Sequence, residues 1–428
     1  MIDIRLIRED PERVKANIRK KFQDEKLELV DKVVDLDAKW RKEKKKTDDL
    51  RSERNKISEE VNQLMKIGKK ADAKGLIAQA KEIPSKIEKI EAKAGKLAEE
   101  IKGIMMKIPQ IIHNSVPLGN DDSENVELER IGEPRVPDYE VFNHVDLAEK
   151  LGGLDLDSSR KTSGQGFYYL KGDIARLHAA ILTYAREFMI GKGFEHTVPP
   201  FMIRADVVTG VMSFAEMDAM MYKIEGEDLY MIGTSEHSMI ALFKDKTLKK
   251  KDLPQTLTSY SPCFRKEKGA HGIEERGLYR VHQFEKQEMI VVCEPEESYK
   301  WYDKMLNWTA EFFRSLDIPV RKLECCSGDL ADLKAKSADI EAWSPRQKKY
   351  FEVGSCTNME DAQARRMGIR INAGTGNYLA HTLNNTVVAS PRALIALMEN
   401  NQLKDGSIKI PKVLQPYMGG MKKIEMKK

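Results

Sequence analysis

The chain has 428 residues, 33% of them charged and 41% apolar, and a formal net charge of +4. This length allows two or three domains with sizeable cores, whereas so small a net charge does not by itself indicate a nucleic-acid binder. Five cysteines without a C-x-x-C pair indicate neither a disulfide framework nor a zinc cage. Since no segment reaches the ~20 apolar residues of a membrane span and the first residues contain no signal-peptide pattern, we expect a cytoplasmic protein without a membrane segment.

Two long heptad series precede residue 110 and predict an antiparallel two-helix coiled coil over about residues 27–108. The first seam comprises Leu29, Val33, Leu36, Trp40, Glu43, Thr47, Leu50, Arg54, Ile57, Val61 and Leu64. The second comprises Leu76, Ala80, Ile83, Ile87, Ile90, Ala94, Leu97, Ile101, Ile104 and Ile108. Gly68 and Gly75 can end the first helix and reverse the chain, and Pro84 is placed to kink the second helix.

Lysines are concentrated on this arm in "KWRKEKKK" and "IGKKADAK". Most heptad arms are spacers or dimerisation elements, and a purely solvated face would carry lysine and glutamate about equally. The excess of lysine in these two runs is also typical of a surface that binds nucleic-acid phosphates. The residues alone leave both readings open.

A connector rich in Pro, Asn, Asp and Gly, residues 109–140, separates the arm from a body that contains aromatic residues and strands. An amphipathic helix opens the body with Ile174, Leu177, Ile181, Tyr184, Ala185, Phe188 and Met189 and ends at Gly191 and Gly193. The strand that follows leads into Pro199-Pro200, which predicts an edge or interface strand. The helix and the strand are consistent either with an ordinary exposed surface or with a dimer interface.

Residues 264–289, "FRKEKGAHGIEERGLYRVHQFEKQEM", predict a β-hairpin of unusual polarity. Alternation places Arg265 and Glu267 on one face of the first strand. On the second strand it places Arg280, His282, Phe284, Lys286 and Glu288 on one side and Val281, Gln283 and Met289 on the other. A solvated sheet would not need a Phe in the middle of the charged row. As a site, the arginines would hold phosphate, Phe284 would stack on a ring and Glu288 would bind a cation.

Three other stretches carry matching chemistry. Thr234 and Glu236 stand between a strand and a helical run, and Glu352 and Ser355 are expected near a turn that precedes Arg365 and Arg366 in a helical stretch. Arg392 falls in the first turn of a helix after Ser390-Pro391. An arginine there opposes the helix dipole, so we expect an anion beside it.

Together, F-R-x-E, R-x-H-Q-F, "TSE", "EVGSCTN", "QARR", "HTLNNT" and the final strand and helix with its arginine resemble the class II aminoacyl-tRNA synthetases. Their wording resembles the seryl-tRNA synthetase family in particular, in its bacterial-like form, over essentially the whole chain. The loop "KGAHGIEERG" and Gly354 differ from the residues that are common at these positions in the family. Neither difference removes a proposed ligand residue. A divergent form of the family uses a zinc ion to bind the amino acid. The intact "TSE" loop argues that this chain does not have that form.

The resemblance implies an α+β fold. An antiparallel β-sheet catalytic domain flanked by helices would span residues 111–428, and an N-terminal tRNA-binding domain with the coiled-coil arm would span residues 1–110. It implies a homodimer that uses ATP, Mg²⁺, L-serine and tRNA(Ser), possibly with tRNA(Sec) as a further substrate.

The resemblance also implies roles for individual residues. Arg265 would bind the α-phosphate, Glu267 would read the adenine and Phe284 would stack on it, while Arg280 and Arg392 would hold the outer phosphates; Arg265 and Arg392 are the catalytic pair. The remaining implied ATP-site residues are Lys266, Val281, Glu352, Val353, Gly354 and Ser355. Glu352 and Ser355 would ligate Mg²⁺. The implied serine-binding residues are Thr234, Ser235, Glu236, Glu288, Asn384 and Thr386. The alternatives are a related enzyme that activates an amino acid for a carrier protein, and a non-catalytic coiled-coil scaffold or RNA-binding protein.

Overall fold

The computed structural model describes residues 1–267 and 277–426; the predicted hairpin loop at 268–276, with Gly269 and Gly272, lies outside the described residues. The chain divides into two compact units, residues 2–109 (the arm unit) and residues 110–428 with Met1 (the sheet unit). No helix in the described ranges combines the length and apolar character needed to cross a membrane.

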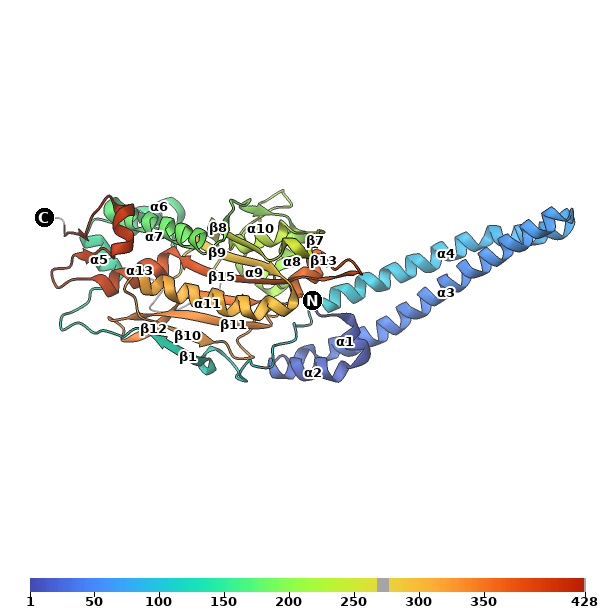
Figure 1. The fold of residues 1–428 in the computed structure, drawn as a ribbon, viewed down its shortest axis with the longest axis horizontal. Helices are drawn as coiled ribbons and strands as arrows, with labels where there is room; N and C mark the ends of the chain where they lie inside the picture. Colours follow the sequence, from blue (N-terminus) through green and yellow to red (C-terminus); the bar gives the residue numbers. More distant parts are fainter. Residues whose placement is uncertain (268–276, 427–428) are drawn as a thin grey trace. The chain divides into compact units, whose positions relative to one another are not determined.

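The arm unit is helical throughout. Its helices are α1 (Ile4–Glu9), α2 (Pro11–Lys20), α3 (Leu27–Lys66) and α4 (Lys70–Met105). The two long helices pack side by side along their seams (Figure 1), where Ile57, Ile83 and Ile87 are buried together. Cross-helix ion pairs add to this contact, since Arg51 binds Glu91 at 2.5 Å and Lys93 binds the buried Glu43 at 2.9 Å. The predicted antiparallel coiled coil is therefore confirmed.

Three details of the arm differ from the sequence prediction. Of the two glycines, only Gly68, with φ of +80°, lies in the turn, whereas Gly75 lies inside α4. Pro84 also lies inside α4, which continues to Met105 without interruption. Arg54 of the predicted seam is exposed. Instead, α3 buries Asp37, whose carboxylate accepts hydrogen bonds from Arg8 of α1 at 2.9 and 2.7 Å.

The sheet unit is built on one eight-stranded sheet. Its order is β1 (Val126–Ile131), β10 (Val320–Glu324), β11 (Lys336–Ser344), β12 (Lys349–Asn358), β15 (His381–Ala389), β9 (Gln283–Cys293), β8 (Gln255–Phe264) and β4 (Glu195–His196). Every neighbouring pair is antiparallel except β4 and β8. This is the antiparallel α+β architecture that the family resemblance implies.

One face of the sheet is covered by α7 (Gly172–Gly191), α11 (Ser298–Ser315) and α13 (Ser390–Asn401), as Figure 1 shows. The alternation of β9 explains this, because Met289, Val291 and Cys293 point into the large core beneath these helices. On the other face, Ile290 and Val292 pack with Leu257 and with α8 (Ala205–Val211), α10 (Ser235–Ala241) and α12 (Ala362–Met367). Both faces of the second half of β9, from Met289 to Cys293, are thus packed against helices. Only the first half of the strand is left for a site.

The remaining elements are short. The helices are α5 (His144–Lys150), α6 (Leu156–Ser163) and α9 (Phe214–Met220). Small sheets pair β2 (Leu154–Asp155) with β3 (Tyr169–Leu170), β5 (Met202–Ile203) with β6 (Tyr230–Met231), β16 (Ile408–Lys409) with β17 (Lys423–Ile424), and β13 (Arg370–Asn372) with β14 (Asn377–Leu379) and β7 (Thr247–Lys249).

These bounds correct one prediction about the large sheet and confirm another. The segment 109–140, predicted as a connector without an element, contains β1, a six-residue strand whose side chains are almost all exposed. The predicted edge strand before Pro199-Pro200 is confirmed as β4, a two-residue strand at the end of the sheet.

Candidate functional site

The charged face predicted for the hairpin exists on β9. Phe284, Lys286 and Glu288 share the face opposite to Met289, and they lie across from Cys263, Ser261 and Ser259 of β8. Because β9 begins only at Gln283, the residues from Arg280 to His282 do not follow the predicted alternation of faces. Val281 packs with Cys263 and Phe284 rather than pointing to the other side. His282 stacks on Phe167, and its Nδ1 lies 2.8 Å from the Tyr222 hydroxyl.

The two arginines of the hairpin are held in different ways. Arg265, directly after β8, donates from Nε to the Gly233 carbonyl at 3.2 Å, and its guanidinium lies 5.3 Å from the centre of the Phe284 ring. Arg280 forms an ion pair with Glu267 at 3.3 Å. Because β8 ends at Phe264, Arg265 and Glu267 do not continue the strand as predicted, yet both line the same cavity.

Arg392 has the anionic neighbour that its position in the first turn of α13 requires. Its Nη1 donates to a Glu352 carboxylate oxygen at 2.7 Å, its Nε donates to the Tyr279 carbonyl at 3.4 Å, and the guanidinium lies 4.6 Å from the centre of the Tyr279 ring. Burial pushes the pKa of Glu352 upward, but the charge and hydrogen bond of Arg392 outweigh it and hold this pKa below its ordinary value. Glu352 therefore remains an anion.

Glu352 and Ser355 lie inside β12 and not near a turn. Glu352 is paired with Glu341, and Ser355 with Asp339, while the register shifts between Ile340 and Glu341. This bulge inserts Val353 and puts Glu352, Ser355 and Asp339 on one face although 352 and 355 are three positions apart. Burial, followed by the charge of Glu352, raises the pKa of Asp339 to about 7. Two carboxylates and a hydroxyl thus converge at one place.

Further along the face, Glu288 is almost wholly buried, with 1% of its side chain exposed. Its Oε1 forms an ion pair with Lys286 and accepts a hydrogen bond from the Thr386 hydroxyl of β15 at 2.9 Å. Asn384, two positions before Thr386, has a buried Nδ2 without a hydrogen-bond acceptor in the described ranges. An unpaired buried group of this kind is suited to a small polar ligand.

The "TSE" residues form the start of α10. Thr234 caps the helix by accepting from the Glu236 amide at 3.3 Å, and the buried Ser235 hydroxyl has no partner among the described residues. Glu236 accepts from Gln363 of α12 at 2.7 Å, and Gln363 in turn accepts from the Thr382 hydroxyl at 2.6 Å. Burial, followed by the charge of Glu288, raises the pKa of Glu236 to about 7.

A cavity of about 110 Å³ collects one half of the predicted residues. It is lined by Arg265, Glu267, Val281, Phe284, Glu352, Val353, Gly354, Thr386 and Arg392, together with Tyr279, Lys286, Ala389 and Pro391. Lys266, Arg280, Ser355, Thr234, Ser235, Glu236, Glu288 and Asn384 are not among its lining residues. The hairpin end of the predicted site is therefore open to a ligand, whereas the carboxylates Glu288 and Glu236 are buried behind it.

Comparison with known proteins decides the family. Residues 1–112 match the family described as seryl-tRNA synthetase N-terminal domain, and residues 221–401 match the tRNA synthetase class II core domain of the G, H, P, S and T enzymes. The serine–tRNA ligase of Methanoregula boonei is 43% identical, over 98% of this chain and 99% of its own length. The chain belongs to the seryl-tRNA synthetase family.

Solved structures of the family agree with this assignment over the full length. The crystal structure of the Pyrococcus horikoshii seryl-tRNA synthetase complexed with ATP has a TM-score of 0.94 and 40% identity, with 100% of both chains covered. The cytoplasmic serine–tRNA ligase of Naegleria fowleri in complex with AMP has a TM-score of 0.89 and 34% identity, covering 100% of this chain and 99% of its own. The class II synthetase fold is thus confirmed. The curated relatives at 40–43% identity are archaeal, so they do not bear out the bacterial-like form.

Four residues of the candidate site escaped the sequence analysis as site residues: Tyr279, Asp339, Gln363 and Thr382. Alternation along the "KSADIEAW" strand could have placed Asp339 on the face of Glu341. Gln363 belongs to the "QARR" wording and Thr382 to "HTLNNT", but their contact joins segments far apart in sequence. Only the fold brings them together.

Proposed function

We propose that this chain attaches L-serine to tRNA(Ser) in two ATP-dependent steps. The serine carboxylate attacks the α-phosphorus of ATP and pyrophosphate leaves; a ribose hydroxyl at the 3′ end of the tRNA then attacks the seryl carbon and AMP leaves. The observation that carries the proposal is the cavity where Arg265, Phe284 and Arg392 lie together, with the buried acid Glu288 further along the β9 face. The relatives named serine–tRNA ligase and the ATP-bound structure support it.

At the ATP end, the arginines supply fixed positive charge where phosphate charge develops. Arg265 would contact the α-phosphate, with Phe284 stacked on the adenine and Glu267 at its amino group, beside Lys266, Val281, Val353 and Gly354. Arg280 pairs with Glu267 and Arg392 pairs with Glu352, and of these four residues Glu267, Glu352 and Arg392 line the small cavity. The triphosphate would compete with the two glutamates for the guanidinium groups. The cavity would widen as these ion pairs are replaced by contacts to phosphate.

Mg²⁺ fits the group formed by Glu352, Ser355 and Asp339, since this ion prefers oxygen ligands. Burial, followed by the charge of Glu352, raises the pKa of Asp339 to about 7, and a cation bound between the two carboxylates would favour their ionised forms. When bound, the metal would neutralise phosphate charge and orient the leaving pyrophosphate. Within the chain, these three side chains would hold it.

At the serine end, Glu288 and Glu236 would receive the ammonium and hydroxyl groups, with Thr234, Ser235, Asn384 and Thr386 around them. We propose in this sense the bacterial-like form of the family, in which protein groups rather than zinc hold the amino acid. Hydrogen bonds to the substrate hydroxyl would exclude alanine strongly, because the groups that now lack partners would stay unpaired.

Replacing Gln363 by Leu should change serine use through the protonation of Glu236. The hydrogen bond from Gln363 lowers the pKa of Glu236, which burial has raised to about 7. Its loss raises that pKa further, so the acidic limb of the kcat/KM profile for serine should move to higher pH while the KM for ATP is unchanged. Pre-steady-state or exchange kinetics between about pH 6 and pH 9 measure this; an unshifted limb would remove Glu236 from serine binding.

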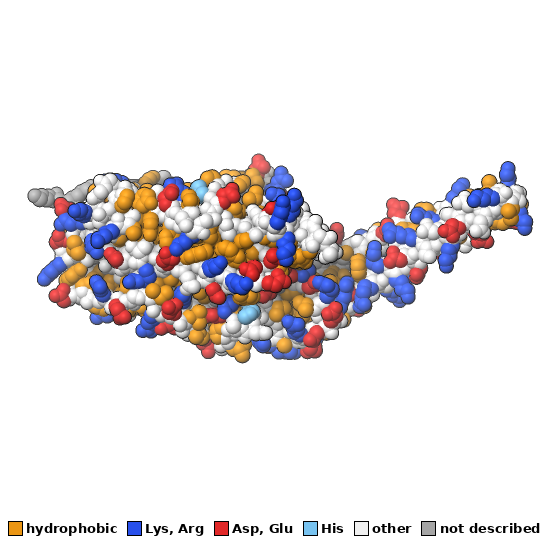
Figure 2. Space-filling model, viewed as in Figure 1, with side chains coloured by type: hydrophobic (Ala, Val, Ile, Leu, Met, Phe, Trp, Pro, Cys, Tyr) orange, Lys and Arg blue, Asp and Glu red, His pale blue; other side chains and the backbone are white. Residues whose placement is uncertain are grey.

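The arm unit and the remaining partners complete the proposal. Residues 1–110 would be the tRNA-binding domain and residues 111–428 the catalytic domain, with tRNA(Sec) as a second substrate and the cytoplasm as the compartment. Figure 2 shows Lys and Arg side chains along the arm, and Lys45, Lys69 and Lys70 are exposed. They can contact phosphates without disturbing the seam.

A homodimer is expected through α7 and the β4 edge. This region exposes Ile190, Val198 and Met202, with 43%, 71% and 45% of their surface accessible. Val198→Glu should therefore weaken the dimer, whereas Leu118→Glu, at a similarly exposed apolar residue (66%), should not. Sedimentation should give twice the 48.8 kDa of one chain; a fully active monomer would contradict the prediction.

Serine-dependent ATP–pyrophosphate exchange, measured beside tRNA charging, tests the function itself. Exchange and charging together are expected. Exchange without charging of any tRNA would favour the enzyme that serves a carrier protein, and the absence of both activities would favour a non-catalytic scaffold. The ordered Phe284 and Glu288 on the β9 face, with Arg265 beside them, argue against the scaffold.

A further inference from the structure

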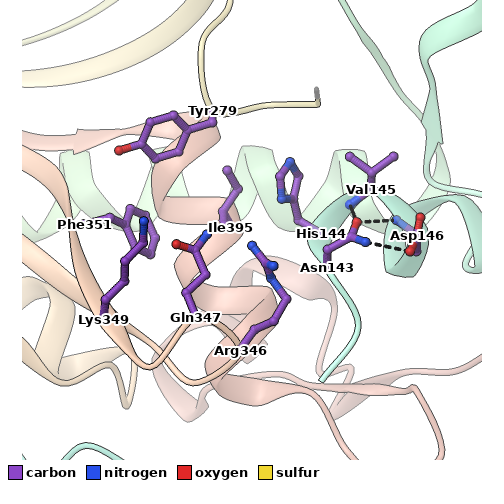
Figure 3. A pocket seen from close by; sticks show the side chains of 10 residues that line it. All are labelled: Asn143, His144, Val145, Asp146, Tyr279, Arg346, Gln347, Lys349, Phe351 and Ile395. Atoms are coloured by element: carbon purple, nitrogen blue, oxygen red, sulfur yellow. Dashed lines mark hydrogen bonds between the residues drawn. The ribbon is translucent and has the colours of Figure 1, made fainter. Parts of the chain in front are cut away.

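A second, larger cavity lies in the sheet unit on the far side of Tyr279. Its volume is about 480 Å³, within the range of small-molecule sites. Figure 3 shows Phe351 and Lys349 at one end, His144 and Val145 at the other, and Gln347 and Arg346 between them. None of these residues belongs to the proposed ATP, serine or metal sites, and Tyr279 is the residue that the two cavities share.

His144 presents a defined hydrogen-bond donor. Its Nε2 accepts from the Leu278 backbone amide at 3.1 Å, so in the neutral ring the proton is on Nδ1. Burial lowers the pKa of His144 to about 4, which keeps the ring neutral at pH 7. The side chain is 8% exposed, and Nδ1 has no partner in the described part of the chain. Gly277 permits this arrangement, since a Cβ there would lie 2.4 Å from Nε2.

Gln347 presents a complementary acceptor. Its Oε1 is buried and has no hydrogen-bond donor within residues 1–267 and 277–426. Its backbone amide donates to Ser344 Oγ at 3.0 Å, which fixes the start of the side chain. A buried polar atom without a partner is costly to the fold. His144 and Gln347 line the same cavity, so a ligand that reached both atoms would satisfy a donor and an acceptor together.

The walls are aromatic and the rim is cationic. The Tyr279 and Phe351 rings lie 6.0 Å apart at 57°, and Val145 and Ile395 supply apolar surface. Arg346 is oriented by Glu399, which accepts from its Nε at 3.0 Å. Lys349 adds a second positive charge. Asp146 accepts a hydrogen bond from the neutral Asn143 amide at 2.6 Å and keeps its negative charge, but it lies at the end of the cavity opposite to Lys349, as Figure 3 shows.

We propose that this cavity binds a nucleotide. The base would pack against Tyr279 and Phe351 and exchange hydrogen bonds with His144 Nδ1–H and Gln347, and the phosphate would face Arg346 and Lys349. A base offers both an acceptor and a donor on one edge, whereas a plain aromatic anion would leave one of the two buried groups unpaired. The nucleotide can be free in solution or part of the 3′ end of a bound tRNA.

Calorimetric titration of the full-length enzyme tests the proposal. The ATP site is first saturated with the non-hydrolysable analogue seryl-sulfamoyl-adenosine, and AMP, GMP, CMP and UMP are then added in turn. At least one should bind with one equivalent per chain. Gln347→Met and Lys349→Gln should each weaken it about fivefold or more, whereas Lys348→Gln, the same change at the neighbouring exposed lysine outside the cavity lining, should not.

Competition separates the two sources. If an intact tRNA blocks the nucleotide and a tRNA without its last three nucleotides does not, the natural occupant is the 3′ end; if both leave binding unchanged, it is a free nucleotide. Titrations without the analogue are run in parallel, so that failure of the analogue to bind counts against the proposed function alone. No binding of any of the four nucleotides, or binding that neither variant weakens, overturns the second site.

Discussion

Arg265→Ala should nearly abolish adenylate formation. The guanidinium is held between the Gly233 carbonyl and the Phe284 ring at the wall of the cavity, so it is oriented before any substrate arrives. Removing one such preorganised interaction with developing charge commonly costs ~3–4 kcal/mol. Serine-dependent ATP–pyrophosphate exchange should therefore fall by about two to three orders of magnitude, since each ~1.4 kcal/mol is a tenfold change.

Two further variants sharpen this experiment. Arg265→Lys keeps the charge but loses the planar fork that donates to Gly233 and stacks on Phe284, so its activity should lie between those of the wild type and the alanine variant. Arg160→Ala removes an exposed arginine that pairs with Asp157 away from the cavity, and exchange should be unchanged. Near-normal exchange by a folded Arg265→Ala protein would refute the assignment of the hairpin to ATP.

The face of β9 could be predicted well from the sequence because a pleated strand has a strict period of two. Phe284, Lys286 and Glu288 followed from it directly. The same rule failed at Val281, since a pattern of residues does not show where hydrogen-bonded pairing begins. Glu352 and Ser355, expected near a turn, lie inside β12 instead, and the bulge that puts them on one face depends on the partner strand.

Contacts between distant segments were out of reach of pattern reasoning. The expected anion at Arg392 could be inferred from the helix dipole, but not that Glu352, forty positions earlier, would supply it. The chain Thr382–Gln363–Glu236 joins β15, α12 and α10. The roles of individual ligands came from the family resemblance and remain proposals.

The most informative test of the arm is to shorten it without disturbing its base. The first part of α3 anchors the short helices, because Asp37 binds Arg8 and Asp31 binds Lys15, each at 2.7 Å. Removal of all of residues 27–108 would expose the buried faces of α1 and α2. Replacing only residues 50–88 keeps these ion pairs, and a four-residue linker that reaches about 13 Å can join two helices packed about 10 Å apart.

The shortened enzyme should form seryl-adenylate at the normal rate, because every proposed ATP and serine ligand lies beyond residue 230. Charging of tRNA should fall by orders of magnitude, since the part of the arm that carries Lys69 and Lys70 is gone. Exchange and charging are measured on the same preparation. Equal loss of both activities would instead indicate a folding defect.

A variant with altered charge then separates the effect of phosphate binding by the arm from the effect of its length. Replacing Lys44, Lys45, Lys69 and Lys70 together with Gln removes four positive charges from an arm of full length. Binding of tRNA should weaken, and the slope of log K against log salt should fall by about one unit for each phosphate that a lysine no longer neutralises. The matched Lys→Arg variant keeps the charges and should preserve the slope. If the Gln variant binds and charges tRNA like the wild type, and the shortened arm does too, the coiled coil is a spacer and tRNA recognition lies elsewhere.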